Sequence, residues 1–182
     1  MILGFDLDGV IADHTRAKIK LAADFGFKIQ AMDTPSEILK TILPKDVLEE
    51  LQKNLYDNLH QESFLTNGVL EVLNEIKIKK LPFFLISRRQ KPLAAVEFLN
   101  KEKLWPQYFN EYNSFFVSEK KDKDIKAKEL GVSHYFDDEV DVLEKLISVE
   151  HKFLFDNYNV FPESNFYTKV SSWEDIKKQL QF

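Results

Sequence analysis

Short apolar runs alternate along this chain with longer stretches in which apolar residues recur at helical spacing. The short runs predict buried strands over residues 2–7, 83–86, 115–117, 134–136 and 153–155. Between consecutive members of the last four strands, helical patterns can serve as crossover connections. These patterns cover residues 92–103, 123–130 and 141–149. Such alternation predicts an α/β fold with a doubly wound, largely parallel sheet.

The stretch between the first and second strands is much longer than a single crossover helix requires. Residues 45–60 carry leucines and a valine one, three and four positions apart, which predicts an amphipathic helix. Residues 69–78 supply a further helix that leads into the second strand. We therefore expect a small helical cap formed by residues 14–66, inserted after the first strand of a core domain formed by residues 1–13 and 67–182.

Composition narrows the class of protein. The chain has 182 residues, 44% hydrophobic content, no Cys and a formal net charge of -5. The absence of Cys excludes a disulfide scaffold and cysteine-based sites and fits a reducing compartment. Because Asp6 and Asp8 interrupt the first apolar run, no secretory signal is expected, and no run is long enough to span a bilayer. We expect a cytoplasmic protein without a membrane or nucleic-acid partner, since its charge is acidic.

Polar side chains stand where the predicted strands end. In doubly wound sheets, ligands bind outside the carboxyl ends of the strands, so these residues should converge on one edge. They are Asp6 and Asp8 after the first strand, Ser87 and Arg88 after the second, Asp137 and Asp138 after the fourth, and Lys123 at the start of a crossover helix.

This set of residue types suits phosphoryl transfer. Asp6 can attack a phosphorus atom and form an acyl phosphate, and Asp8, followed by the flexible Gly9, can act as the general acid and base. Carboxylates favour Mg²⁺, which would neutralise the nucleophile and the incoming phosphate. We expect the metal ligands to be Asp6, Asp8 and Asp138, and the phosphate ligands to be Ser87, Arg88 and Lys123.

Four segments in order resemble the motifs of the haloacid dehalogenase-like (HAD) superfamily. They are the segment 5–10 with Asp6-Leu7-Asp8-Gly9, the run 83–87 ending in Ser87, Lys123 near a helix start, and Tyr135-Phe136-Asp137-Asp138. The resemblance implies a HAD-like Rossmann-type core, a type 1 cap between the first two motifs, and a phosphatase that uses Mg²⁺ and an aspartyl-phosphate.

Other segments are similar to the 5'-nucleotidase and deoxyribonucleotidase-like group of that superfamily. The similar segments are residues 9–13, 86–89, 130–138, 157–159 and 170–174. This likeness implies a nucleotide as the small phosphorylated metabolite. A sugar-phosphate phosphatase or phosphomutase on the same core, and a catalytically idle relative that binds a phospho-ligand or partner, are the alternatives.

Several assignments have competitors within the chain. Asp137 or Asp141 can support the metal beside Asp138, because the second acid of the fourth motif is not at its usual spacing. Lys120, Lys121, Lys126 and Lys128 crowd the stretch around Lys123. Arg88 and Arg89 can hold phosphate or form salt bridges, and His14 stands out among the histidines because it lies near the first motif. The sequence does not indicate the oligomeric state.

Overall fold

The computed structural model describes residues 1–57 and 63–181. Its main sheet has six strands in the order β5-β4-β1-β6-β7-β8, and every neighbouring pair is parallel. The strands are β1 (Leu3–Phe5), β4 (Phe83–Arg88), β5 (Ser114–Val117), β6 (His134–Asp137), β7 (His151–Phe155) and β8 (Thr168–Val170). The predicted α/β fold with a parallel sheet is therefore confirmed.

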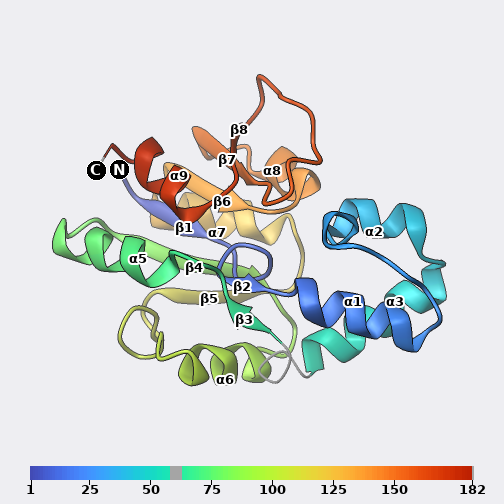
Figure 1. Ribbon diagram of the computed structural model, residues 1–182. Helices are drawn as coiled ribbons and strands as arrows, with labels where there is room; N and C mark the ends of the chain where they lie inside the picture. The colour runs from blue at the N-terminus through green and yellow to red at the C-terminus, as the bar shows by residue number, and fades with distance from the viewer. Residues whose placement is uncertain (58–62, 182) are drawn as a thin grey trace.

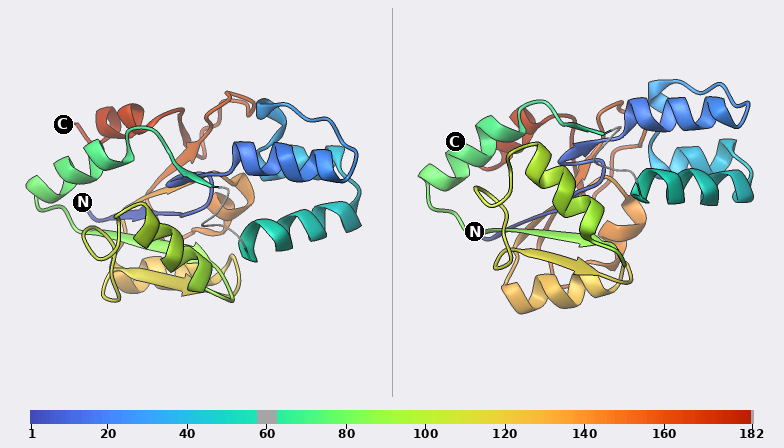
Figure 2. Two further views of the ribbon diagram at one scale, coloured as in Figure 1. Left: turned by 60° about the horizontal axis from the view of Figure 1, so that its bottom comes forward. Right: turned by 90° about the horizontal axis from the view of Figure 1, so that it is seen from below.

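Helices cover both faces of this sheet (Figures 1 and 2). One face packs against α5 (Val69–Ile78), α6 (Leu93–Lys101) and α9 (Trp173–Gln179), and the other against α7 (Asp122–Leu130) and α8 (Val140–Lys145). The winding direction reverses at β1, which lies between β4 and β6. The end of β1 is thus the topological switch point, where ligands bind in sheets of this kind.

A separate group of helices stands beyond the carboxyl ends of the strands, opposite the two chain termini (Figure 1). It comprises α1 (Thr15–Asp24), the 3₁₀ turn η1 (Ala31–Asp33), α2 (Ser36–Ile42) and α3 (Lys45–Asp57). These helices have their own apolar core, which includes Ala22, Leu39 and Leu51. The last part of the predicted helix 45–60 lies outside the described residues.

Two short strands connect this cap group to the main sheet. β2 (Ala12–Asp13) pairs antiparallel with β3 (Phe64–Leu65), so the chain leaves and re-enters the core side by side. Neither strand was predicted, because two residues are too few for a periodic pattern. The two segments that connect the cap group to the core are therefore joined to each other by backbone hydrogen bonds.

Two further differences from the predicted elements have local causes. α8 ends at Lys145, well before the predicted end at residue 149, because Leu146 leaves helical backbone angles. β8 was missed, since its three residues Thr-Lys-Val carry no long apolar run. α9 follows it, capped by Ser172, whose hydroxyl accepts a hydrogen bond from the Asp175 backbone N–H.

α9 also fixes the loop after β1. The indole of Trp173 is fully buried, stacks on Phe5 with ring centroids 5.1 Å apart, and donates through Nε1 to the Val10 carbonyl at 2.9 Å. A buried aromatic contact with a satisfied polar group is stabilising and directional. It holds the segment that carries Asp6 and Asp8 against the core.

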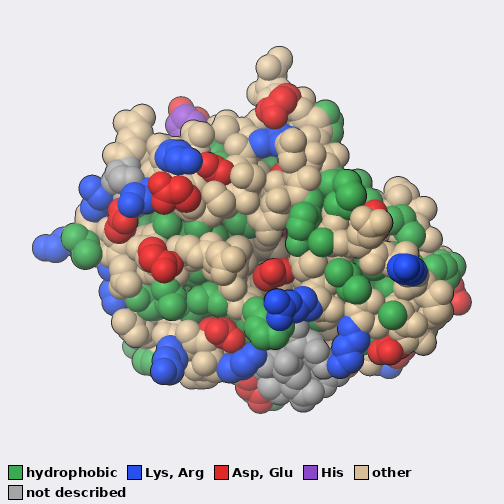
Figure 3. All heavy atoms as spheres, viewed as in Figure 1, with side chains coloured by type: hydrophobic (Ala, Val, Ile, Leu, Met, Phe, Trp, Pro, Cys, Tyr) green, Lys and Arg blue, Asp and Glu red, His purple; other side chains and the backbone are tan. Residues whose placement is uncertain are grey.

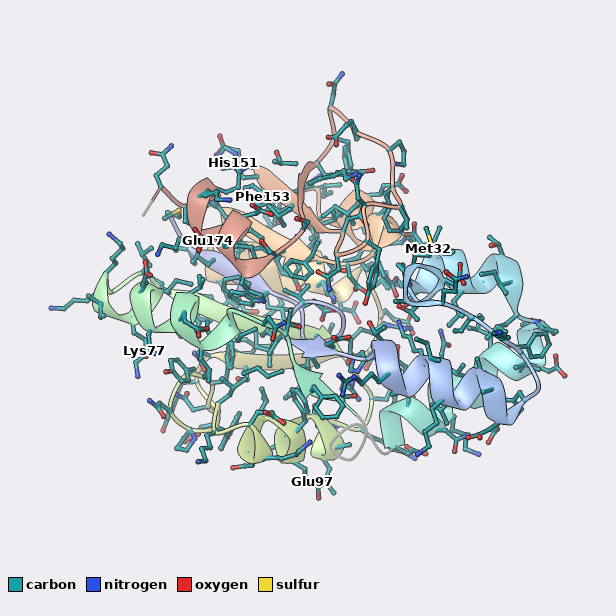
Figure 4. All side chains as sticks on the ribbon, in the orientation of Figure 1. Met32, Lys77, Glu97, His151, Phe153 and Glu174 are labelled. Atoms are coloured by element: carbon teal, nitrogen blue, oxygen red, sulfur yellow. The ribbon has the colours of Figure 1, made fainter. Side chains whose placement is uncertain are left out.

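On the face seen in Figure 3, acidic and basic side chains are interspersed, and hydrophobic side chains are more frequent over the cap. Met32 on the cap and Glu97 on α6 both point outward (Figure 4). In the described ranges 1–57 and 63–181, no helix combines the length and apolar character needed to cross a bilayer.

Candidate active site

Asp6 stands immediately after β1, at the switch point. Its backbone N–H donates to the Phe136 carbonyl at 2.9 Å, which ties it to the neighbouring strand β6. Its side chain is only 6% exposed, and Oδ1 lies 3.0 Å from Nζ of Lys123. A buried carboxylate at the switch point, held by this ion pair with a buried ammonium, is positioned to act on a ligand.

Lys123 belongs to the first turn of α7 and is 1% exposed. Its ammonium also donates to Asp137 Oδ2 at 2.8 Å. Burial opposes the charge of Lys123, but Asp137 and Asp6 more than compensate and raise its pKa well above the usual value. Lys123 therefore stays protonated and supplies fixed positive charge between two buried acids.

Asp6, Asp137 and Asp138 form a compact acidic group. One carboxylate oxygen of each lies within 4.8 Å of the others. Burial raises the pKa of all three, to about 7 for Asp137, where Lys123 offsets part of the effect. Three carboxylates, two of them buried and that of Asp138 half-buried, against one ammonium leave a formal charge of -2, which a divalent cation would balance. The donor set is oxygen only, as Mg²⁺ prefers.

Gly9 allows this group to form. Its φ of +77° belongs to the left-handed region, and a Cβ there would lie 2.2 Å from Oδ2 of Asp138. Such an approach is impossible for any side chain, so only Gly lets the loop after β1 pass the Asp138 carboxylate. The Gly of the predicted Asp-x-Asp-Gly motif is thus required both for the turn and for the contact.

Asp8 faces different partners from Asp6. Its Oδ1 accepts hydrogen bonds from Nη2 of Arg89 at 2.5 Å and from Nε2 of His14 at 2.8 Å. Burial alone would raise the pKa of Asp8, but Arg89 and His14 hold it far below the usual range. Asp8 is therefore an ionised carboxylate whose charge is neutralised locally. Its carboxylate is not part of the three-acid group, and its metal role stays a prediction.

His14 and Arg89 join Asp8 to the cap. Because an ionised carboxylate only accepts, Nε2 of His14 carries a proton, and Nδ1 lies 2.7 Å from the hydroxyl of Ser63. Burial lowers the pKa of His14, which favours the neutral ring. The Arg89 guanidinium stacks over Tyr56 of α3, 4.8 Å from its ring centroid. The two partners of Asp8 are thus themselves held by residues near the end of the cap, His14 by Ser63 and Arg89 by Tyr56.

The predicted phosphate ligands differ in exposure and in their partners. Ser87 on β4 is fully buried, and its hydroxyl has no hydrogen-bond partner in the described ranges. Arg88, the next residue, is exposed, while Arg89 is buried against Asp8. Of the crowded lysines, Lys123 reaches Asp6, whereas Lys120 is bound by Glu139 and Asp141.

A pocket between core and cap connects these groups, and we call it the catalytic pocket. From the cap it includes Lys18, whose Nζ donates to the Thr34 carbonyl at 2.9 Å. Its remaining lining residues are Asp6, Asp8, His14, Ser36, Leu55, Tyr56, Arg88, Lys120, Lys123, Asp138, Glu139 and Val142. His14 stood out in the sequence through its nearness to the first motif. Lys18 and Tyr56 were not predicted to lie there, because a helical cap sequence gives no signal for which face meets the core.

Several solved structures share the fold of this chain over nearly its whole length. A HAD family hydrolase from Deinococcus radiodurans R1, with bound phosphate and sodium, matches 98% of this chain and 94% of its own, with a TM-score of 0.68 and 14% identity. A HAD-superfamily hydrolase from Ehrlichia chaffeensis matches 98% and 95%, with a TM-score of 0.64 and 13% identity. The chain has the HAD hydrolase fold.

A third similar structure is a HAD hydrolase, family IA, variant 3, from Entamoeba histolytica HM-1:IMSS. It matches 96% of this chain and 94% of its own, with a TM-score of 0.64 and 14% identity. No model of a protein family matches the sequence, and no curated protein matches it either. At these identities the likeness concerns the fold, and the chemistry has to be argued from the site.

Proposed function

We propose that this protein is a magnesium-dependent phosphohydrolase that cleaves a small phosphomonoester through an aspartyl-phosphate. The observation that carries the proposal is the position of Asp6. It lies at the switch point, 3.0 Å from the buried ammonium of Lys123 and within a group of three carboxylates short of positive charge. The shared fold with a HAD family hydrolase that binds phosphate supports the same class of ligand.

The residues present fit a magnesium ion. We propose Asp6 and Asp138 as ligands, with Asp137 as a further ligand or as the group that orients Lys123. When bound, the ion would supply positive charge that neutralises the nucleophile and the phosphoryl oxygens. The sequence predicts Asp8 as a third ligand, but because His14 and Arg89 engage its carboxylate, we expect it to contribute less to metal binding than Asp138.

Asp6 provides the nucleophilic oxygen. Attack on phosphorus forms the bond between this oxygen and phosphorus and releases the alcohol, and water then cleaves the acyl phosphate. Lys123 stabilises the negative charge that shifts onto the phosphoryl oxygens. Ser87 has a free buried hydroxyl, and with Arg88 it is the proposed further phosphate ligand.

We assign the two proton transfers of the reaction to Asp8. In the first step it would donate a proton to the leaving oxygen, and in the second it would take one from the attacking water. Its present contacts hold it ionised, which suits the second step. The first step therefore requires Asp8 to gain a proton while substrate is bound and its contacts with Arg89 and His14 change.

The substrate classes left by the sequence are nucleotides and sugar phosphates. Resemblance to the 5'-nucleotidase group favours a nucleoside monophosphate, and the same core would serve a sugar-phosphate phosphatase or phosphomutase. Phosphate release from a panel of both classes with Mg²⁺ present separates these possibilities, because a mutase would return an isomeric phosphate instead of inorganic phosphate.

The mechanism is tested by Asp6→Asn. We expect phosphate release to fall at least about a thousandfold, because the amide is a poor nucleophile. In the wild type, acid quenching during turnover should leave phosphate on the peptide that contains Asp6, detected by mass spectrometry. Asp24→Asn, at the exposed end of α1, is the matched control and should retain full activity. Unchanged turnover in Asp6→Asn would refute the proposal.

A further inference from the structure

The catalytic pocket is too small for a whole substrate. Its volume is about 30 Å³, room for roughly two or three water-sized groups. That suits the phosphoryl end of an ester. The alcohol portion of a metabolite must therefore extend into a neighbouring space.

A larger pocket adjoins it at Arg88. This pocket has a volume of about 270 Å³ and lies between α3 of the cap and the segment that follows β4. Arg88 and Tyr56 line both pockets, so an ester with its phosphoryl group near Asp6 would pass these two side chains. We call this larger space the leaving-group pocket.

The leaving-group pocket is strongly basic, although the chain as a whole is acidic. Four of its side chains are cationic and one, Asp57, is acidic, so its formal charge is +3. Arg89 is paired with Asp8, but within the described residues neither Arg88 nor Lys91 forms an ion pair with a carboxylate. Lys53 has only a distant exposed partner, Glu50 at 3.9 Å.

We propose that the leaving group of the substrate carries a second anionic group, a carboxylate or a phosphate, bound by Lys53 and Lys91, with Arg88 between this anion and the transferred phosphoryl group. This inference rests on the proposed phosphohydrolase function and specifies its substrate class. Arg offers a planar fork that binds either anion through two hydrogen bonds, and each Lys adds a point charge. An uncharged leaving group would leave Arg88 and Lys91 without a carboxylate partner among the described residues.

Matched substrates test the inference, with phosphate release measured in Mg²⁺. 2-Phosphoglycolate and ethyl phosphate differ by a carboxylate in place of a methyl group, and fructose 1,6-bisphosphate and fructose 6-phosphate differ by a phosphate. We expect kcat/KM to be at least about tenfold higher for the member with the second anionic group in one or both pairs. Which pair shows the preference identifies the second anion as carboxylate or phosphate.

The double variant Lys53→Gln with Lys91→Gln connects this preference to the pocket. We expect the ratio of kcat/KM between the substrate with the second anionic group and its partner without it to fall about fivefold. The change should come mainly from KM of the substrate with the second anion. Lys45→Gln is the matched control, because Lys45 lies on the same helix α3, is exposed and does not line the pocket. Its ratio should equal that of the wild type.

The two proposals fail in different ways. Absence of Mg²⁺-dependent phosphate release from every ester, or full turnover by Asp6→Asn, would overturn the proposed function. Clear phosphatase activity with equal kcat/KM within both pairs would overturn only the second-anion inference. A preference that survives unchanged in the double variant would overturn it as well, because the anion would then bind elsewhere.

Discussion

The two aspartates of the Asp6-Leu7-Asp8 segment sit in two differently built parts of one site. The Asp6 group, formed with Asp137, Asp138 and Lys123, comes entirely from the sheet and α7. The Asp8 group draws on both sides of the core–cap boundary. Its members besides Asp8 are Arg89 after β4, His14 at the start of the cap, Ser63 at its end and Tyr56 on α3.

The Asp6 group and the Asp8 group also differ in their balance of charge. The Asp6 group has three carboxylates and one ammonium, and burial raises the pKa of each acid. In the Asp8 group, one carboxylate is matched by Arg89 and assisted by His14, so the pKa of Asp8 falls. The first group has an excess of negative charge that an added cation would balance, whereas the charge of Asp8 in the second group is balanced by Arg89. One therefore suits metal and nucleophile, the other proton transfer linked to the cap.

Removing the single ammonium of the Asp6 group should have the largest effect. In Lys123→Met, Asp6 and Asp137 lose their common counter-charge, and we expect phosphate release to fall at least about a thousandfold. The free energy of unfolding without Mg²⁺ should fall by roughly 3 kcal/mol, because breaking a buried pair leaves an uncompensated charge. Activity assays and urea denaturation measure the two effects.

Lys126→Met is the control for that variant. Lys126 lies on the same helix and pairs with the exposed Glu129 at 2.5 Å, so its loss should change stability by less than about 0.5 kcal/mol. If Lys126→Met were as harmful as Lys123→Met, the effect would belong to the helix and not to the charge balance of the Asp6 group.

Magnesium affinity should separate the two aspartate groups. We expect Asp138→Asn to weaken Mg²⁺ binding at least about tenfold and Asp8→Asn to change it by less than about threefold, as measured by calorimetry. The reason is that the Asp8 carboxylate is engaged by His14 and Arg89, away from the three acids. Equal weakening in the two variants would instead support the metal role predicted for Asp8 from the sequence.

A smaller effect is expected from loosening Asp8 at the cap boundary. In His14→Gln, one of the two partners of Asp8 changes while Arg89 remains, so kcat should fall about tenfold with KM little altered. Steady-state kinetics distinguishes this from a binding role. A large rise in KM at constant kcat would show that His14 contacts substrate and does not position Asp8.

The smallest effect should come from a site outside both groups. Asp175 accepts hydrogen bonds from Ser171 and Ser172 at the start of α9, and the Lys178 and Ser171 hydrogen bonds depress its pKa. Asp175→Asn should lower the free energy of unfolding by about 1 kcal/mol without changing kcat or Mg²⁺ affinity.

The pH dependence of that difference has a defined sign. Because the folded state lowers the pKa of Asp175, its stabilising effect is present above the unfolded value, 3.8, and is lost as pH falls below it. Urea denaturation at pH 7 and pH 3 should show the gap between wild type and Asp175→Asn closing at the lower pH. A gap as large at pH 3 as at pH 7 would contradict the assignment to the charged carboxylate.

The sequence alone determined the parallel α/β core and the edge of the sheet at which the candidate site residues lie. Five strands were predicted from short apolar runs, because burial on both faces of a sheet leaves a continuous apolar segment. Asp6, Lys123 and Asp138 were predicted to converge for the same reason, since parallel strands end on one edge. Their association depends on the parallel direction of the strands, which the alternation of strands and helices indicates.

Only the tertiary structure decided the surroundings of Asp8 and the shape of the substrate space. His14, Tyr56 and Arg89 meet through packing between segments far apart in sequence, and no local period specifies which face of a cap helix turns to the core. Arg88 and Arg89 are the same residue type in the sequence. Arg88, the last residue of β4, is nevertheless exposed, and Arg89, the next residue, is buried. The site thus joins a part set by strand ends with a part set by docking of the cap.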